Sequence, residues 1–478
     1  MKDTNFIIVS AIFVLILVSL LTNYNGTTDV NEYTSVAKFF AGEYNAKVRS
    51  AHSLTYGFIN APLLKISENF YNMKLISLIL IIIIIFSIYF ISGKDKKALI
   101  LISISPIIFY MGPWINPIQL SSLLFLWGFF FIRKFELNPK NIYLIYSGIL
   151  IGLSWVFWNT VLFILPFFVI CFFFNKRFSQ LILFSLALLA GLLPLLIFDY
   201  YYFTTPFYSI FRHLMANVST FLYGRIYSGI DNQVSISAYI AFFIMLPLFG
   251  YTFFKKQFFK ENNSVIIFIT LVILFFLTNP QIRYLLFIWP ILILTLSKSL
   301  NDKQLKIQII LFIIISLIVI TPYVIQLKYS TNSEELTNLL INFGNWKLYN
   351  DPNKSINQEI IEIAKEYPNS TFLVGNNADD YAYLANIYWG KDIKEFVSIQ
   401  DYELYFKNET SLFKKRFEPK PIIPDRRIIW IEGGISKNPN DNTNYGNITL
   451  AISINEPLNE PGFRLIKKYN ILYLSEKV

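Results

Sequence analysis

The sequence predicts a mainly α-helical, polytopic membrane protein with about eleven spans and a small extracytoplasmic α/β domain at its C-terminal end. Three observations predict this class. Hydrophobic residues make up 54% of the 478 positions, and many of them stand in long uninterrupted runs. Beyond residue 327 the apolar runs shorten, while Asn, Asp, Glu and Pro become more frequent. Ordinary soluble domains are less hydrophobic and lack such runs, so that class is excluded.

Eleven apolar runs are candidate membrane spans, because roughly 20 helical residues cross the hydrocarbon core of a bilayer. We predict spans at 6–21, 75–91, 98–111, 118–132, 142–157, 161–174, 179–198, 236–254, 265–277, 284–296 and 307–325. No A-x-A-like cleavage site follows the first run. It is therefore expected to remain as a helix rather than to be removed as a signal peptide.

Positive charge is concentrated in the membrane part and predicts the topology. Residues 1–326 carry 23 Lys and Arg against 11 Asp and Glu, whereas residues 327–478 carry 18 against 20. The basic clusters occupy alternate loops, near residues 94–97, 133–140, 176–177, 255–260 and 298–306. This pattern places the N-terminus and these loops in the cytoplasm, and the C-terminal domain outside the cell membrane. Such short clusters beside spans indicate topology, so no nucleic-acid partner is predicted.

The chain is predicted to divide into a transmembrane domain at 1–326 and an outer α/β domain at 327–478. The transmembrane domain has two long outer loops, 22–74 and 199–235, and the first contains an amphipathic helix at 31–40. The outer domain alternates helices and strands, as is typical of an α/β arrangement. Helices are expected at 355–367 and 379–389, and strands at 371–374, 427–432 and within 465–474.

Asp29 is the leading catalytic candidate, because it follows the first span within a few residues and stands at the predicted membrane rim. Ionisable groups at that depth are costly and often functional. The alternative is an N-cap of the helix at 31–40, and one residue can serve both purposes. Glu32 and Glu43 are further candidates in the same loop, and Glu32 could instead complete a capping box.

Arg283 is the leading binding candidate, because it stands where an outer loop re-enters the membrane, in TNPQIRYLLFIWP. A guanidinium offers several donors in a fixed fork that suits a phosphate. The alternative is an arginine that snorkels to the interface. Further candidates for substrate contacts are Arg49 and His52 in the first outer loop and Arg212 in the second. For these, packing of a polar loop on the bundle is the alternative.

Aromatic and metal-binding residues give weaker signals. Trp114 and Asn116, in the turn at 112–117, could stack on a sugar ring, although interfacial anchoring is the commoner role of such a tryptophan. The chain has two histidines and one cysteine, which is too few for a histidine-rich metal site. No cofactor is predicted, and a divalent metal is left open without being indicated.

Three stretches together resemble the GT-C superfamily of multi-spanning glycosyltransferases, which includes protein mannosyltransferases and aminoarabinose transferases. They are the early outer-loop Asp29 with EYTSVAKFFAGEY, then LLPLLIFDYYYFTTPF at 192–207, and IRYLLFIWPIL at 282–292. The likeness covers residues 1–326 loosely. The sequence departs from the pattern of this superfamily in two ways. The first-loop acidic pair, Asp29 and Glu32, is not adjacent, and no WWDYG-like stretch occurs in the outer domain.

The resemblance implies inverting transfer of one sugar from a polyprenyl (dolichyl-type) phosphate to a lipid, glycan or protein acceptor on the outer face. Asp29 would act as the base, while Arg283 and Tyr284 would contact the donor. A lipid-linked-sugar flippase or transporter is the alternative, although it would favour ionisable residues in mid-span. An O-antigen polymerase or ligase is the other alternative.

Overall fold

Apolar helices make up most of the described residues up to residue 328, as the long apolar runs predict. The computed structural model describes residues 2–22, 51–66, 71–158, 178–203, 206–210 and 282–328, seven strands near the C-terminus, and short pieces or single positions elsewhere. Two compact units are formed by Met1–Gly26 with Lys74–Tyr349 and by Thr27–Met73 with Asn350–Val478. The domain boundary at residue 326 stays a prediction.

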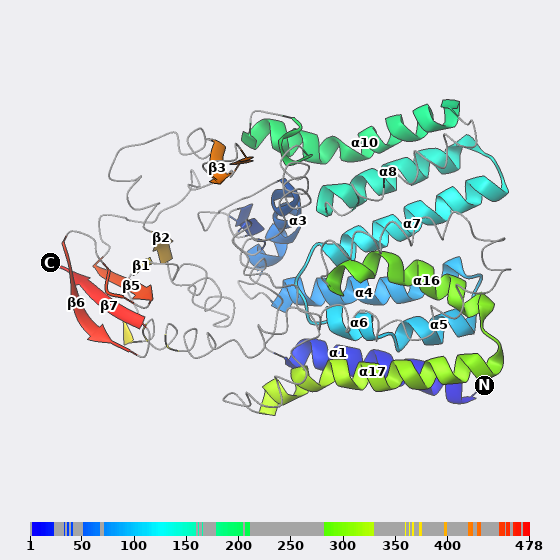
Figure 1. Ribbon diagram of the computed structural model, residues 1–478, viewed down its shortest axis with the longest axis horizontal. Helices are drawn as coiled ribbons and strands as arrows, with labels where there is room; N and C mark the ends of the chain where they lie inside the picture. Colours follow the sequence, from blue (N-terminus) through cyan, green and yellow to red (C-terminus); the bar gives the residue numbers. More distant parts are fainter. Residues whose placement is uncertain are drawn as a thin grey trace. The chain divides into compact units, whose positions relative to one another are not determined.

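Apart from α3, which falls within the predicted outer loop at 22–74, the described helices overlap the predicted spans (Figure 1). They are α1 (Lys2–Leu21), α3 (Ala51–Ile66), α4 (Tyr71–Ile91), α5 (Lys96–Ser103), α6 (Pro106–Met111), α7 (Ile118–Leu137), α8 (Asn141–Phe157), α10 (Phe178–Phe203), the 3₁₀ turn η2 (Ile282–Tyr284), α16 (Leu285–Ser299) and α17 (Asp302–Lys328). Within the described residues, five stretches are long and apolar enough to cross a membrane: Asn72–Ile91, Ile118–Leu137, Phe178–Tyr201, Ile282–Ser299 and Asp302–Thr321. The predicted spans at 236–254 and 265–277, and nearly all of 161–174, lie outside the described residues.

The span predicted at 98–111 is two helices, α5 and α6, separated at Ile104 and Ser105. Pro106 explains the break, since a proline disfavours helical geometry in the residue before it, and Ser105 has extended backbone angles. Two neighbouring helices satisfy the polar groups freed by the break. Ser316 donates to the Ile104 carbonyl at 2.7 Å, and Trp289 Nε1 donates to Ser105 Oγ at 2.8 Å. A broken helix inside a bundle needs such partners.

Helices α7, α8 and α10 lie side by side, with α7 antiparallel to α8 (Figure 1). Ser121 Oγ near the start of α7 donates to the Ser154 carbonyl near the end of α8, at 2.7 Å. The packing of α8 on α10 is close because glycines face each other: a methyl group added at Gly152 would overlap the Leu188 carbonyl oxygen. Gly148 meets Ala187 while Gly152 meets Gly191, so these two helices run parallel. Small residues that let backbones approach in this way are typical of membrane helix pairs.

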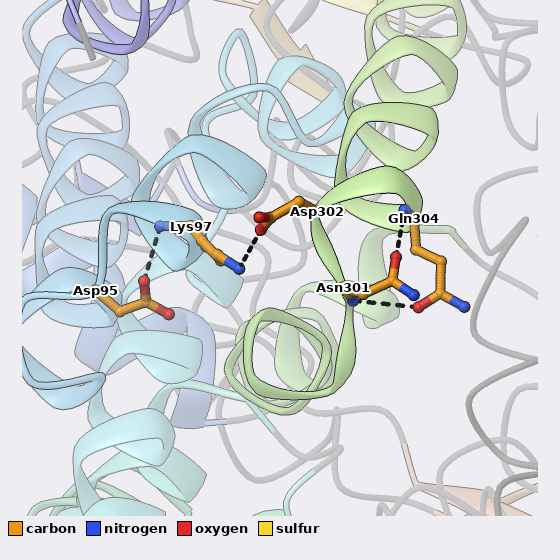
Figure 2. A network of polar contacts seen from close by, with 5 residues as sticks. All are labelled: Asp95, Lys97, Asn301, Asp302 and Gln304. Atoms are coloured by element: carbon orange, nitrogen blue, oxygen red, sulfur yellow. Dashed lines mark hydrogen bonds and ion pairs between the residues drawn. The ribbon is translucent and has the colours of Figure 1, made fainter.

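Two predicted cytoplasmic loops meet at one end of the bundle, as Figure 2 shows. Lys97 at the start of α5 forms an exposed salt bridge of 2.9 Å with Asp302 at the start of α17. Each helix is also capped there: Asp95 accepts from the Lys97 backbone N–H, and Asn301 and Gln304 exchange side-chain and backbone hydrogen bonds as in a capping box. We call this end of the bundle the Lys97 end.

The second unit contains the predicted α/β region. Its strands are β1 (Phe372–Val374), β2 (Phe396–Ser398), β3 (Pro419–Ile423), β4 (Ile428–Ile431), β5 (Leu450–Ile454), β6 (Phe463–Lys468) and β7 (Leu472–Lys477). Five of them form a sheet in the order β2-β1-β5-β7-β6. Strand β1 pairs in parallel with β2 and β5, and β7 pairs antiparallel with β5 and β6. The predicted fold class, a helical membrane bundle with a small α/β domain, is confirmed.

Candidate functional site

The candidate site lies at the end of the bundle opposite the Lys97 end, and we call it the Arg283 end. Helix α8 ends there, because its C-cap residue Trp158 contacts Arg283. Helix α17 also ends there, because Trp114 Nε1, in the turn between α6 and α7, donates to the Tyr323 hydroxyl at 3.2 Å. The end of α1 reaches the same turn, since a methyl group added at Gly112 would touch Ser19 Oγ at 2.6 Å.

Arg283 occupies the 3₁₀ turn η2 that leads into α16, and it is only 6% exposed. Its guanidinium carbon lies 5.4 Å from the centre of the Trp158 ring and 5.5 Å from that of Tyr284. These two rings are 6.0 Å apart and tilted by 46°. Aromatic faces attract a guanidinium and hold its plane in a fixed position. A snorkelling arginine keeps its head group in water, so the burial of Arg283 favours the binding interpretation.

Lys74 is a second buried cation at this end, and the sequence reasoning missed it. It stands in the first turns of α4, it is 1% exposed, and its Nζ donates to the Thr22 carbonyl at 2.6 Å. The hydrogen bond joins the end of α1 to the start of α4 across the predicted first outer loop. A lysine at the edge of an apolar run is a signal that could have found it.

Asp199 is a fully buried carboxylate near the end of α10. Both of its oxygens accept from Ser209: Oδ2 from the backbone N–H at 2.8 Å and Oδ1 from the hydroxyl at 2.7 Å. Since α10 runs parallel to α8, this contact also lies at the Arg283 end. The carboxylate fixes the direction in which the chain leaves α10 and enters the predicted second outer loop.

The turn between α6 and α7 is packed inside the bundle rather than at an interface. Trp114 and Asn116 are both 0% exposed. The Tyr323 hydroxyl that accepts from Trp114 donates in turn to the Tyr110 carbonyl at 2.7 Å. Trp114 is therefore a buried connection between α6 and α17. Asn116 Oδ1 accepts the backbone N–H of Ile118 at 3.0 Å, which caps the start of α7.

Several predicted site residues cannot be placed in this geometry. Asp29, Glu32, Glu43, Arg49 and Arg212 lie outside the described residues, and His52 lies in the first turn of α3 without a described side chain. Arg283 and Tyr284 are placed, and they are brought together with Trp158, which the sequence reasoning had not selected. The described part of the chain holds no group of three or more His, Cys, Asp or Glu that could bind a metal ion.

Comparison with known proteins yields a match at the level of the fold. No family model and no curated protein matches the chain. Two solved structures match it over 100% of its length and 98% of theirs. They are ArnT from Cupriavidus metallidurans bound to undecaprenyl phosphate, at 11% identity and a TM-score of 0.54, and the same enzyme in the apo state, at 9% and 0.55. At this identity the likeness shows the fold alone: the chain has an ArnT-like fold over its whole length.

Proposed function

We propose that the chain is a membrane glycosyltransferase that moves one sugar from a polyprenyl phosphate to an acceptor on the outer face, with inversion. The whole-length likeness to ArnT, which has been captured with undecaprenyl phosphate, is the observation that carries the proposal. The buried cation Arg283, at the end of the bundle away from the exposed Lys97–Asp302 bridge, supports it further. The donor is of the undecaprenyl or dolichyl type and carries a hexose or a pentose, and the acceptor is a lipid, a glycan or a protein.

Arg283 binds the phosphate of the donor in this proposal. A phosphate that departs from the sugar gains negative charge, and a cation fixed in a poorly solvated site stabilises that charge more than water does. The rings of Trp158 and Tyr284 lie next to each other and both contact the guanidinium. In this proposal N–H groups of the guanidinium donate to the phosphate oxygens.

Asp29 is the base in this proposal. The acceptor hydroxyl oxygen attacks the anomeric carbon, its proton passes to Asp29, and the bond between that carbon and the phosphate oxygen breaks. The electron pair leaves with the lipid phosphate. One carboxylate is sufficient, because a phosphate needs charge stabilisation more than protonation, whereas a glycoside hydrolase uses two carboxylates. The remaining predicted residues, Glu32, Glu43, Arg49, His52, Tyr284 and Arg212, contact donor or acceptor.

Sugar transfer in membranes tests the proposal. Membranes that contain the full chain receive undecaprenyl phosphates bearing radiolabelled sugars, with sugar nucleotides as the control donors. The expected result is loss of label from the lipid and its recovery in a product, together with release of undecaprenyl phosphate. Movement of intact lipid-linked sugar across the membrane without cleavage would identify a flippase instead. Transfer from sugar nucleotides alone would also contradict the proposal.

A further inference from the structure

Three polar side chains, Asn116 in the turn before α7 and Gln119 and Ser122 in its first turns, are buried at the Arg283 end. Asn116, Gln119 and Ser122 are each at most 1% exposed. Asn116 Nδ2, Gln119 Oε1 and Ser122 Oγ lack a hydrogen-bond partner in the described structure. In the side-chain amides of Asn116 and Gln119, the other polar atom forms hydrogen bonds, and these bonds fix the orientation of each amide. Asn116 Oδ1 accepts from Ile118, and Gln119 Nε2 donates to the Met111 and Trp114 carbonyls at 3.2 and 3.0 Å.

A fourth unpartnered polar atom, Trp155 Nε1, comes from α8. Trp155 is 6% exposed, and its indole N–H has no acceptor within the part of the chain that the structure describes. It precedes Trp158 by three residues, and side chains three apart lie on the same face of a helix. Trp158 covers Arg283, so Trp155 lies about one turn deeper along the same side of α8.

The register between α7 and α16 places the first turns of α7 at about the same depth in the bundle as Arg283. Both helices start at the Arg283 end, and the Phe125 and Phe287 rings contact each other at 5.9 Å. Arg283 precedes Phe287 by four residues, and Ser122 precedes Phe125 by three, which is about one turn in each helix. Gln119 lies about one turn nearer the start of α7. We call Asn116, Gln119, Ser122 and Trp155 the neutral polar cluster.

Buried polar atoms without partners are rare in native proteins, because each costs folding free energy that water would otherwise have offset. Four of them lie at the Arg283 end of the bundle, around the start of α7 and the end of α8, and they indicate a place where a ligand supplies the missing partners. The atoms are uncharged, with donors at Asn116 and Trp155, an acceptor at Gln119 and both functions at Ser122. Hydroxyl groups both donate and accept, so a carbohydrate ring matches this set. A charged group would find no opposite charge in the neutral polar cluster.

We infer that the neutral polar cluster binds the hydroxyl groups of an uncharged sugar whose phosphate is held by Arg283. This inference rests on the proposed function and deepens it, since it assigns the sugar specificity to α7 and α8. A sugar attached to a phosphate through its anomeric carbon lies directly beside that phosphate. The neutral polar cluster and Arg283 therefore bind adjoining parts of one donor. A neutral hexose or pentose is therefore the transferred group, rather than an amino sugar or a uronic acid.

Donor binding to the full-length protein in nanodiscs tests the inference. The probes are undecaprenyl phosphate alone and the same lipid bearing each of a panel of neutral hexoses, neutral pentoses, an amino sugar and a uronic acid. Wild type is expected to bind at least one neutral-sugar lipid more tightly than the bare lipid. Ser122→Ala and Trp155→Phe each weaken that binding about two- to tenfold, the usual effect of losing one hydrogen bond. Both leave the affinity for bare undecaprenyl phosphate unchanged.

Matched control variants remove polar atoms that already have protein partners. Ser147 Oγ donates to the Gly128 carbonyl, and Trp127 Nε1 donates to Ser87 Oγ. Ser147→Ala and Trp127→Phe should leave the sugar's contribution to affinity unchanged. Thermal unfolding checks the folding of every variant. Ser122→Ala is expected to unfold no earlier than wild type, since its hydroxyl bonds nothing in the described part of the protein. Trp155→Phe also removes part of a buried ring, so it is expected to unfold somewhat earlier, as Trp127→Phe is.

Three results would overturn the inference. If both cluster variants bind the sugar-bearing lipid as wild type does, the unpartnered atoms hold water only, while the proposed function stands. The inference also fails alone if only the amino sugar or the uronic acid raises the affinity, or if the variants weaken both kinds of lipid equally. If wild type binds no polyprenyl phosphate at all, with or without a sugar, the proposed function fails and this inference fails with it.

Discussion

The guanidinium of Arg283 lies 5.4 Å from the centre of the Trp158 ring, although the two residues belong to different helices that are far apart in the sequence. Trp158 ends α8, and Arg283 begins the segment that leads into α16. The contact therefore joins two helix ends and orients a buried cation at once. In the proposed mechanism this cation holds the lipid phosphate, so its orientation decides how well the donor binds.

Trp158→Leu should weaken the binding of undecaprenyl phosphate without unfolding the bundle. A desolvated cation–π contact contributes roughly 0.5–2 kcal/mol, which corresponds to a loss of about two- to thirtyfold in affinity. Trp158→Tyr keeps an aromatic face and should lose much less. The measurement is lipid affinity in nanodiscs. Equal affinities for wild type and Trp158→Leu would show that the ring does not orient Arg283.

Asp199→Asn should keep most of the activity, whereas Asp199→Ala should lose stability. In Asp199→Asn the amide oxygen still accepts the Ser209 backbone N–H, and the amide nitrogen can donate to the Ser209 hydroxyl, which then acts as acceptor. In Asp199→Ala the buried N–H is left without its acceptor, at a cost of about 1–3 kcal/mol. Thermal unfolding and sugar transfer are measured together. A stable but inactive Asp199→Asn would mean that the charge itself takes part in catalysis.

Gly152→Ala should destabilise the protein, because its methyl group would overlap the Leu188 carbonyl of α10 and the two helices would have to separate. Overpacking of this kind costs about 1–3 kcal/mol. Ile142→Ala, at a position of the same helix that is 43% exposed, is the matched control and should change stability little. The unfolding midpoint in detergent compares them. A Gly152→Ala variant as stable as wild type would contradict the close approach of α8 and α10.

The proposed topology predicts opposite labelling of the two ends of the bundle. In a Cys171→Ser background, Lys140→Cys lies between α7 and α8 at the Lys97 end, and Phe207→Cys follows α10 at the Arg283 end; both positions are exposed. An impermeant maleimide should label Phe207→Cys in intact cells and Lys140→Cys only in inverted vesicles. Basic loops stay in the cytoplasm, which is the reason for this expectation. The reverse pattern would place the site on the cytoplasmic face.

The membrane helices could be predicted because a span is a local signal: an apolar run of sufficient length. Arg283 could be selected as a candidate for a similar reason, since a charge at the edge of such a run stands out. The span predicted at 98–111 consists of two helices, α5 and α6, and Pro106 marks the break between them. The hydrophobicity of this run is continuous across the break, so its length alone indicates a single helix.

The contact partners of Arg283 and Lys74 could not be predicted, because they depend on contacts between distant segments. Nothing in the neighbourhood of Trp158 marks it as the residue that covers Arg283, and the pairing of Lys74 with Thr22 spans a whole loop. In the α/β domain, β1 and β4 were expected at their positions, while β2, β3 and β5 were missed, because their pairing is set by neighbouring strands. The stretch predicted at 465–474 overlaps two strands, β6 and β7, joined by a tight connection.

Donor binding and single-turnover sugar transfer, measured on Asp29→Asn and Arg283→Met in one preparation, test the central claim most directly. A base that acts in the transition state contributes about 10²–10⁴ in rate. Asp29→Asn should therefore bind the sugar-bearing undecaprenyl phosphate as wild type does but transfer its sugar at least about 100-fold more slowly. Arg283→Met should lose affinity for this lipid. Transfer by Asp29→Asn at the wild-type rate, or undiminished lipid binding by Arg283→Met, would contradict the account.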